Sequence, residues 1–108
     1  EFLYSDDLAD AVVYLMETKN AKEIGEFVNI GAGIDLTIKN VAEKVKEIVY
    51  GDIIGRTCHI IWDVSKPNGT PRKLLDVSKL TSLGWTATTS LDEGIKHAYN
   101  DFLSERAE

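Results

Sequence analysis

The segment KPNGTPRKLLDVSKLTSLGW, residues 66–85, holds the residues whose types and spacing point most clearly to chemistry. Lys66 and Arg72 are fixed positive charges on either side of a short stretch that contains two prolines and a glycine, which restrict the backbone and lower the ordering cost of binding. Arg72 is suited to gripping a phosphate with two hydrogen bonds, and Lys66 to acting as a point charge. Asn68 offers a donor and an acceptor to a sugar hydroxyl or a keto oxygen. Residues 66–72, called the basic loop below, are therefore predicted to bind an anion.

The charge of the whole chain limits what that anion is. Net charge is −6, from 12 Lys and Arg against 18 Asp and Glu. Four cations nevertheless fall between positions 66 and 79, where Asp76 is the single acidic residue. An acidic protein with one basic segment favours a small anionic ligand over a nucleic acid, which an acidic surface repels. The alternative interpretation is a solvated, lysine-rich turn without a ligand.

A glycine-containing turn elsewhere imitates a cofactor site. Gly31-Ala32-Gly33 lies between a predicted strand and a predicted helix, and Asp63 follows the next strand, as in a dinucleotide-binding unit. The third glycine of that fingerprint is missing, and Asp35 would bring negative charge towards the phosphates. We therefore expect this segment to be a turn and expect no cofactor-binding residue in the chain.

Metal-binding and catalytic sets are also poorly supported. Cys58 and His59 are adjacent, so on a strand they point to opposite faces, and His97 is isolated on the last predicted helix. No nucleophile and base are spaced for joint action. None of the four tyrosines has a lysine four residues later, the pair that nicotinamide-dependent ketoreductases commonly use. We expect neither a metal site nor a catalytic residue here.

Hydrophobic periodicity and capping residues predict the elements that position the basic loop. Four helices are expected, opened by Ser5, Thr37, Asp76 and Ser90. The first is expected to end near Thr18 or Asn20, and the third at Gly84. Two strands are expected, at Glu26–Ile30 and His59–Trp62. The pattern predicts a small mixed α/β domain, with about four helices and two or more short strands, that occupies residues 1–108.

Composition favours an ordinary reduced globular protein. The hydrophobic content of 44% suits a core of normal size. No apolar run approaches the ~20 residues needed to cross a bilayer, and no secretion signal opens the sequence. With Cys58 as the single cysteine there is no disulfide framework. We expect a cytoplasmic protein that does not bind membranes.

Four blocks together carry a family resemblance: EFLYSDDLADAVVYLME, EFVNIGAGIDLTIKNVAEKVKEIV, WDVSKPNGTPRKLLDVSKLTSLGW and SLDEGIKHAYNDFL. They resemble the C-terminal region of the GDP-L-fucose synthase family, within the extended short-chain dehydrogenases/reductases. The resemblance covers nearly the whole chain. The block KPNGTPRKLLDVSKL followed by LGW is its most specific part, since the other features suit many nucleotide-sugar epimerases and dehydratases.

The resemblance implies a division of labour. In that family an N-terminal Rossmann domain binds NADP(H) and carries the catalytic Ser, Tyr and Lys, while the C-terminal region binds the GDP-sugar. Residues 1–108 would then be a single C-terminal substrate-binding domain, without the Rossmann domain and without a cofactor of its own. The parent enzyme, a homodimer, would epimerise GDP-4-keto-6-deoxy-D-mannose at C3 and C5 and reduce C4 with NADPH. The chain alone is predicted to be inactive.

Two departures from the family pattern concern substrate binding. The family's loop usually reads Lys-Pro-Asp-Gly, with the acid touching the substrate, whereas this chain has Asn68 at that position. An arginine that helps to bind the substrate normally precedes the Glu-Phe-Leu segment, and this sequence starts at Glu1. The resemblance assigns substrate binding to Lys66, Asn68 and Arg72.

Two other interpretations stay open. One is the substrate domain of a different nucleotide-sugar epimerase or reductase with a similar loop. The other is a non-catalytic nucleotide-sugar-binding module that kept the fold and lost the chemistry, because fold alone does not fix function.

Overall fold

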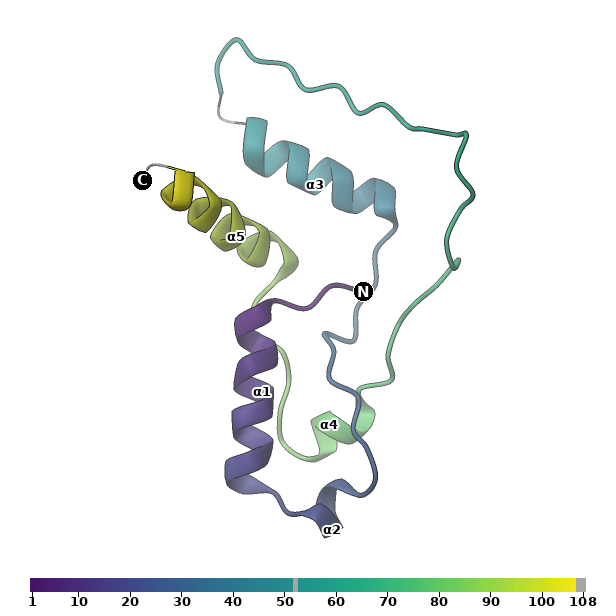
Figure 1. The fold of residues 1–108 in the computed structure, drawn as a ribbon, viewed down its shortest axis with the longest axis vertical. Coiled ribbons are helices and arrows are strands. Elements are labelled where there is room, and N and C mark those ends of the chain that lie inside the picture. The colour runs from purple at the N-terminus through teal and green to yellow at the C-terminus, as the bar shows by residue number, and fades with distance from the viewer. Residues whose placement is uncertain (52, 107–108) are drawn as a thin grey trace. The chain divides into compact units, whose positions relative to one another are not determined.

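The computed structural model describes residues 1–51 and 53–106, and these form two compact units (Figure 1). Unit 1 comprises residues 1–35 and 73–91, and unit 2 comprises residues 36–72 together with the chain from residue 92 onward. The helices in the described residues are α1 (Ser5–Thr18), α2 (Ala21–Ile24), α3 (Ile38–Tyr50), α4 (Ser78–Ser82) and α5 (Leu91–Arg106). α1, α2 and α4 belong to unit 1, whereas α3 and nearly all of α5 belong to unit 2. The prediction of one domain over residues 1–108 stays a prediction.

All four predicted helices are confirmed, although their starts differ in detail. The Thr37 hydroxyl caps α3 as predicted, accepting a hydrogen bond from the Asn40 nitrogen at 3.1 Å. Ser5 is the first residue of α1 rather than its cap, and no side chain caps that helix. α1 ends at Thr18, and α5 begins directly after Ser90, both as predicted.

The start of α4 is stabilised from one position further out than predicted. Asp76 Oδ1 accepts a hydrogen bond from the Ser78 nitrogen at 2.9 Å, while Val77 occupies the cap position between them. Hydrogen bonds from the side chain and then the backbone of Ser78 hold the pKa of Asp76 below its ordinary value. The predicted capping residue is thus one residue early, but it does satisfy an amide at the helix start.

Sequence reasoning missed the short helix α2. The Asn20 side chain accepts hydrogen bonds from the Lys22 and Glu23 nitrogens, and the Glu23 carboxylate accepts one from the Asn20 nitrogen at 2.9 Å. This reciprocal pair is a capping box. Its signature, Asn20 followed three residues later by Glu23, was present in the sequence.

The predicted strand Glu26–Ile30 is not confirmed, because no strand forms within residues 1–51 and 53–106. The Phe27 carbonyl oxygen instead accepts a hydrogen bond from Lys79 Nζ at 2.6 Å. Asn29 Nδ2 donates to the Asp76 carbonyl oxygen at 3.2 Å. Both hydrogen bonds go to the segment that follows the basic loop. In a strand, the Phe27 carbonyl oxygen would instead accept from the backbone of a neighbouring strand.

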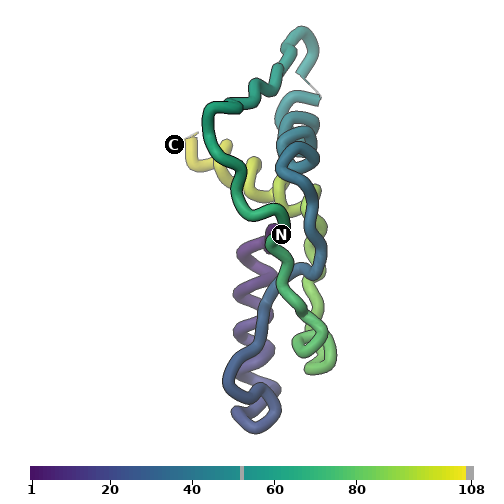
Figure 2. The backbone as a smooth tube through the Cα atoms, turned by 90° about the vertical axis from the view of Figure 1, so that its right-hand side faces the viewer, coloured from purple at the N-terminus to yellow at the C-terminus, as the bar shows by residue number. Residues whose placement is uncertain are grey.

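The second predicted strand, His59–Trp62, is not confirmed either. It lies in a long segment of unit 2 without helix or strand, where Ile61 is almost fully exposed (Figure 1, Figure 2). A segment rich in β-branched and aromatic residues forms a strand only where a partner strand is available to complete the hydrogen-bond ladder. In the described part of the chain, the mixed α/β prediction is therefore confirmed for its helices and not confirmed for its strands.

The buried core lies in unit 1 and consists of Ala11, Leu15, Leu80 and Trp85. α4 ends in a Schellman motif, with the Trp85 nitrogen donating to the Leu80 carbonyl at 3.2 Å and the Gly84 nitrogen to that of Thr81 at 3.0 Å. Gly84 has a φ of 99°, which only glycine adopts without strain. The motif brings Leu80 and Trp85 into the core against α1.

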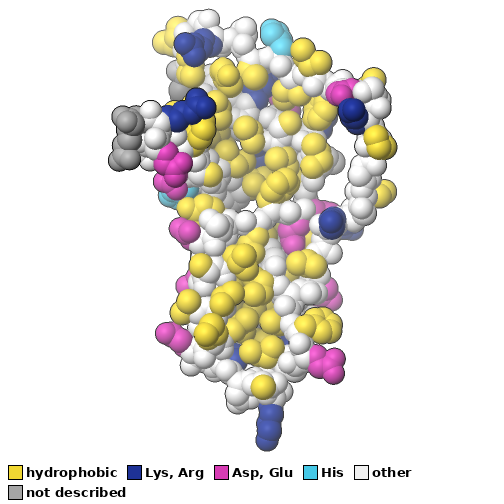
Figure 3. All heavy atoms as spheres, viewed as in Figure 1, with side chains coloured by type: hydrophobic (Ala, Val, Ile, Leu, Met, Phe, Trp, Pro, Cys, Tyr) yellow, Lys and Arg dark blue, Asp and Glu magenta, His cyan; other side chains and the backbone are white. Residues whose placement is uncertain are grey.

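One face of α1 is apolar but exposed. Leu8, Val12, Val13 and Met16 are all exposed, and apolar side chains gather on this face of unit 1 (Figure 3). No helix in the described residues is both long enough and apolar enough to cross a membrane.

Candidate functional site

The basic loop is open to solvent throughout. Every side chain of residues 66–72 is exposed, and the loop lies in the long segment without helix or strand (Figure 2). A turn fixed by Asp63 precedes it, because Asp63 Oδ1 accepts hydrogen bonds from the Ser65 hydroxyl at 2.6 Å and from the Ser65 nitrogen at 3.0 Å. These two bonds lower the pKa of Asp63. The carboxylate therefore stays ionised at neutral pH, and it binds Ser65, the residue that directly precedes the loop.

The four cations that the sequence groups together belong to two different units: Lys73 and Lys79 to unit 1, Lys66 and Arg72 to unit 2. Lys66 and Arg72 lie in the exposed part of unit 2, as Asn68 does. Lys79 in unit 1 has a structural role, because its Nζ donates to the Phe27 carbonyl oxygen and lies 5.6 Å from the centre of the Phe27 ring. The binding roles of Lys66, Asn68 and Arg72 stay predictions.

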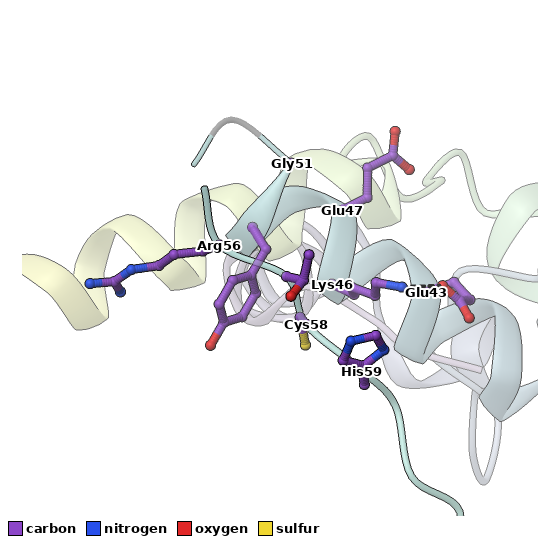
Figure 4. A pocket seen from close by; sticks show the side chains of 9 residues that line it. Glu43, Lys46, Glu47, Gly51, Arg56, Cys58 and His59 are labelled. Atoms are coloured by element: carbon purple, nitrogen blue, oxygen red, sulfur yellow. Dashed lines mark ion pairs between the residues drawn. The ribbon is translucent and has the colours of Figure 1, made fainter. Parts of the chain in front are cut away.

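Sequence reasoning missed a hollow of about 500 Å³ within unit 2, beside the end of α3 (Figure 4). Its lining residues are Glu43, Lys46, Glu47, Tyr50, Gly51, Arg56, Thr57, Cys58 and His59. None of the three predicted binding residues lines it. The wall mixes two acidic with two basic side chains, so its charge does not favour one sign of ligand.

The lining of the hollow differs from the predicted orientation of Cys58 and His59. Cys58 and His59 were predicted to point to opposite faces of a strand, yet both line the hollow, because their segment is not a strand (Figure 4). Lys46 Nζ lies 3.7 Å from a carboxylate oxygen of Glu43 one turn earlier on α3. Within residues 1–51 and 53–106 there is no group of three His, Cys, Asp or Glu side chains arranged to hold a metal ion.

Unit 1 contains one buried carboxylate, Asp7. It accepts hydrogen bonds from the Thr89 nitrogen at 2.9 Å, the Thr89 hydroxyl at 3.0 Å and the Thr88 hydroxyl at 3.2 Å. Burial raises the pKa of Asp7, but the hydrogen bonds from Thr89 and Thr88 together outweigh that effect and leave the pKa below its ordinary value. Asp7 therefore links α1 to the turn before α5 as an ionised structural group.

The glycine-containing turn binds a carboxylate of the chain itself. The Gly33 nitrogen donates a hydrogen bond to Glu1 Oε2 at 2.9 Å. Gly31 is buried, and a Cβ atom on it would lie 2.5 Å from Glu1 Oε1. Gly31 thus makes room for the Glu1 side chain and the Gly33 nitrogen donates to it, which gives this turn a structural role.

Comparison with known proteins identifies what the chain resembles. No family model matches it. It is 48% identical over 103 residues to GDP-L-fucose synthase 1 of Arabidopsis thaliana, which covers 95% of this chain and 29% of that protein. A GDP-6-OMe-4-keto-L-xylo-heptose reductase from Campylobacter jejuni superimposes with a TM-score of 0.85 at 38% identity, covering 97% of this chain and 31% of the other. A GDP-mannoheptose C4 reductase from the same organism, solved with NADP bound, gives a TM-score of 0.78 at 38% identity, over 95% and 31%.

These comparisons confirm the resemblance predicted from the sequence. The chain is similar to GDP-L-fucose synthase over nearly its whole length, and its fold is similar to that of GDP-sugar reductases. It spans between 29% and 31% of the length of the relatives that it matches.

Proposed function

We propose that this chain is the GDP-sugar-binding portion of an NADP-dependent GDP-L-fucose synthase. The observation that carries the proposal is the 48% identity to a GDP-L-fucose synthase over 103 residues. The enzyme would convert GDP-4-keto-6-deoxy-D-mannose to GDP-L-fucose by epimerisation at C3 and C5 and reduction at C4. NADPH would supply the hydride from a part of the enzyme outside residues 1–108.

In this proposal the basic loop binds the nucleotide-sugar. Arg72 holds the diphosphate with two parallel hydrogen bonds, and Lys66 adds a point charge. The Asn68 amide meets the sugar, where the resembling family usually has an acid. The exposure of all three side chains supports the proposal, because each is accessible to a ligand.

The test is a titration of GDP into the intact protein. We expect Lys66→Ala combined with Arg72→Ala to lower the affinity for GDP at least about tenfold, since two charge-assisted contacts are lost. Lys22→Ala combined with Lys39→Ala is the matched control, because it removes the same charge from exposed positions outside the loop. GMP, with one phosphate, should bind more weakly than GDP. Unchanged GDP affinity in the loop variant would overturn the proposal.

A second candidate function is reduction of a GDP-heptose. It is supported by the TM-scores of 0.85 and 0.78 with the two Campylobacter reductases. Both candidates predict preference for GDP over UDP, so the base does not distinguish them. The keto-sugar distinguishes them. We expect faster NADPH consumption with GDP-4-keto-6-deoxy-D-mannose than with a GDP-4-keto-heptose.

Assembly and location complete the proposal. The resemblance supports a cytoplasmic homodimer with no nucleic-acid partner. Light scattering of the intact protein tests the dimer, and a mass that corresponds to one subunit would contradict it.

A further inference from the structure

Residues 57–63, with the sequence TCHIIWD, have the composition of a β-strand and are called the 57–63 segment below. β-branched and aromatic residues make up most of the run, and no proline or glycine interrupts it. Its length is that of an ordinary strand. The segment lies entirely within unit 2 and contains no helix.

The exposure of its side chains alternates as in a strand with one covered face. Cys58 and Ile60 are partly buried, whereas His59 is exposed and Ile61 is 90% exposed. Trp62, the next residue on the covered face, is still 49% exposed. Alternation with a period of two is typical of extended backbone. Unit 2 therefore covers this apolar face only in part.

The backbone of the segment lacks hydrogen-bond partners among the described residues. Within residues 1–51 and 53–106, no backbone nitrogen or carbonyl oxygen of residues 57–63 makes a hydrogen bond. The hydrogen bonds of the segment go to the Asp63 side chain, which accepts from Ser65. The segment thus presents a row of donors and acceptors along each edge, which is the kind of surface that another strand binds.

Comparison with the relatives indicates where a partner strand lies. The described residues of unit 2 supply helices but no strand. The chain spans only 29% to 31% of the length of its relatives, so most of the proposed enzyme lies outside residues 1–108. A strand from that part would complete the hydrogen-bond ladder and extend the apolar layer over Trp62.

We propose that the 57–63 segment pairs along one edge, as a β-strand, with a strand of the same polypeptide outside residues 1–108. The apolar side chains of that strand face the same side as Ile60 and Trp62. This inference rests on the proposed function, because that proposal places the chain within a larger enzyme.

The pairing also limits the movement of the basic loop. Asp63 ends the segment and fixes the turn at Ser65, the residue before Lys66. When the segment is held along its edge, this turn and Lys66 have fewer orientations, which lowers the entropy lost on binding a ligand.

Hydrogen exchange of the intact protein without ligand is the first test. The N–H groups of successive residues in a strand point to opposite edges. Pairing along one edge should therefore slow the exchange of alternate amides, either those of Cys58, Ile60 and Trp62 or those of the residues between them. We expect exchange about a hundredfold slower than in the basic loop. Exchange throughout the segment as fast as in the loop would overturn the proposal.

Proline substitutions separate strand pairing from simple burial. Ile60→Pro and Ile61→Pro each remove one N–H, and the two N–H groups point to opposite edges. One of the two variants should abolish the slow exchange of the alternate amides, and the other should keep it. Ile60→Ala and Ile61→Ala are the matched controls, because they shorten the same side chains and retain the N–H. Equal effects of the two prolines would contradict pairing along one edge.

Nuclear Overhauser contacts across the ladder identify the partner by its residues. Contacts from the 57–63 segment to a strand outside residues 1–108 would support the proposal. Isotope-filtered spectra of mixed labelled and unlabelled protein should show no such contact between subunits. Contacts to the 57–63 segment of a second copy, or to any other part of residues 1–108, would overturn it.

This inference and the proposed function fail in different ways. If the parent protein binds no GDP, the proposed role of the basic loop fails, while slow exchange of alternate amides still supports the pairing. If GDP binds but the 57–63 segment exchanges as fast as the loop, the pairing is overturned and the proposed function stands.

Discussion

The two units differ in how their amphipathic helices are used. In unit 1, Leu15 on α1 is buried against Leu80 and Trp85. In unit 2, α3 has the stronger amphipathic pattern, yet none of its described residues is fully buried. Hydrophobic periodicity therefore specifies a helix and its apolar face, whereas burial depends on the segments packed against that face.

The polar contacts differ in the same way. Unit 1 is tied together by side chains that bind distant backbone or buried groups, such as the Tyr14 hydroxyl donating to the Leu83 carbonyl at 2.7 Å and Trp85 Nε1 donating to Asp10 at 2.8 Å. In unit 2, an ion pair joins Lys44 on α3 to Asp92 on α5 at 2.6 Å, at the surface. We therefore expect substitutions in unit 1 to cost more stability.

The largest expected effect comes from truncating the core. Leu80 is 1% exposed, and Leu80→Ala should lower the free energy of unfolding by about 3 kcal/mol, because it leaves a cavity between α4 and α1. Val45→Ala on α3, where Val45 is 40% exposed, should cost less than about 1 kcal/mol. Urea denaturation of the intact protein measures both.

Fluorescence allows each unit to be followed separately. Trp85 reports on unit 1 and is 6% exposed, whereas Trp62 reports on unit 2 and is 49% exposed. Replacing the other tryptophan with Phe isolates each signal. Equal losses from Leu80→Ala and Val45→Ala would contradict the contrast between the units.

The next effect concerns the buried carboxylate. Asp7→Asn should cost about 2 kcal/mol at neutral pH, because Thr88 and Thr89 would then donate to a neutral group that also brings donors of its own. Asp6→Asn changes the exposed neighbouring residue and is the matched control.

The pH dependence of Asp7 has a definite sign. Since folding lowers the pKa of Asp7 below its ordinary value of 3.8, its contribution to stability is fully present above that value. The contribution is lost as the pH falls through the lower, folded-state pKa. The parent protein should therefore lose more stability than Asp7→Asn when acidified from about pH 5 to about pH 3. Parallel acid transitions would contradict this role.

The smallest expected effect belongs to unit 2. Breaking the surface pair with Lys44→Ala or Asp92→Ala should cost about 0.5 kcal/mol, because solvent screens exposed charges. A double-mutant cycle over the two changes measures the coupling. A coupling energy above about 2 kcal/mol would show that the pair acts as a buried one.

The helices were predictable from the sequence because their signals are local. Apolar spacing located α1 and α3, and Thr37 marked the start of α3 correctly. The capping box at Asn20 was an equally local signal for α2. The predicted strands failed for the opposite reason: a strand needs a partner, and Glu26–Ile30 binds Lys79 and the Asp76 carbonyl instead.

The candidate site was predictable only in part. Turn-forming residues and charge located the basic loop, and the structure does leave Lys66, Asn68 and Arg72 exposed. The diversion of Lys79 to Phe27 and the contact between Glu1 and Gly33 depend on residues that are far apart in the chain. The hollow beside α3 could not be predicted from the sequence either, because its wall combines a helix with a segment later in the chain.

The measurement that tests the central claim most directly is hydrogen exchange of the intact protein with and without GDP. We predict that GDP slows exchange within residues 64–73, the basic loop and its immediate neighbours. Protection confined to the hollow, at residues 56–59 and the end of α3, would contradict the account, as would no protection at saturating GDP.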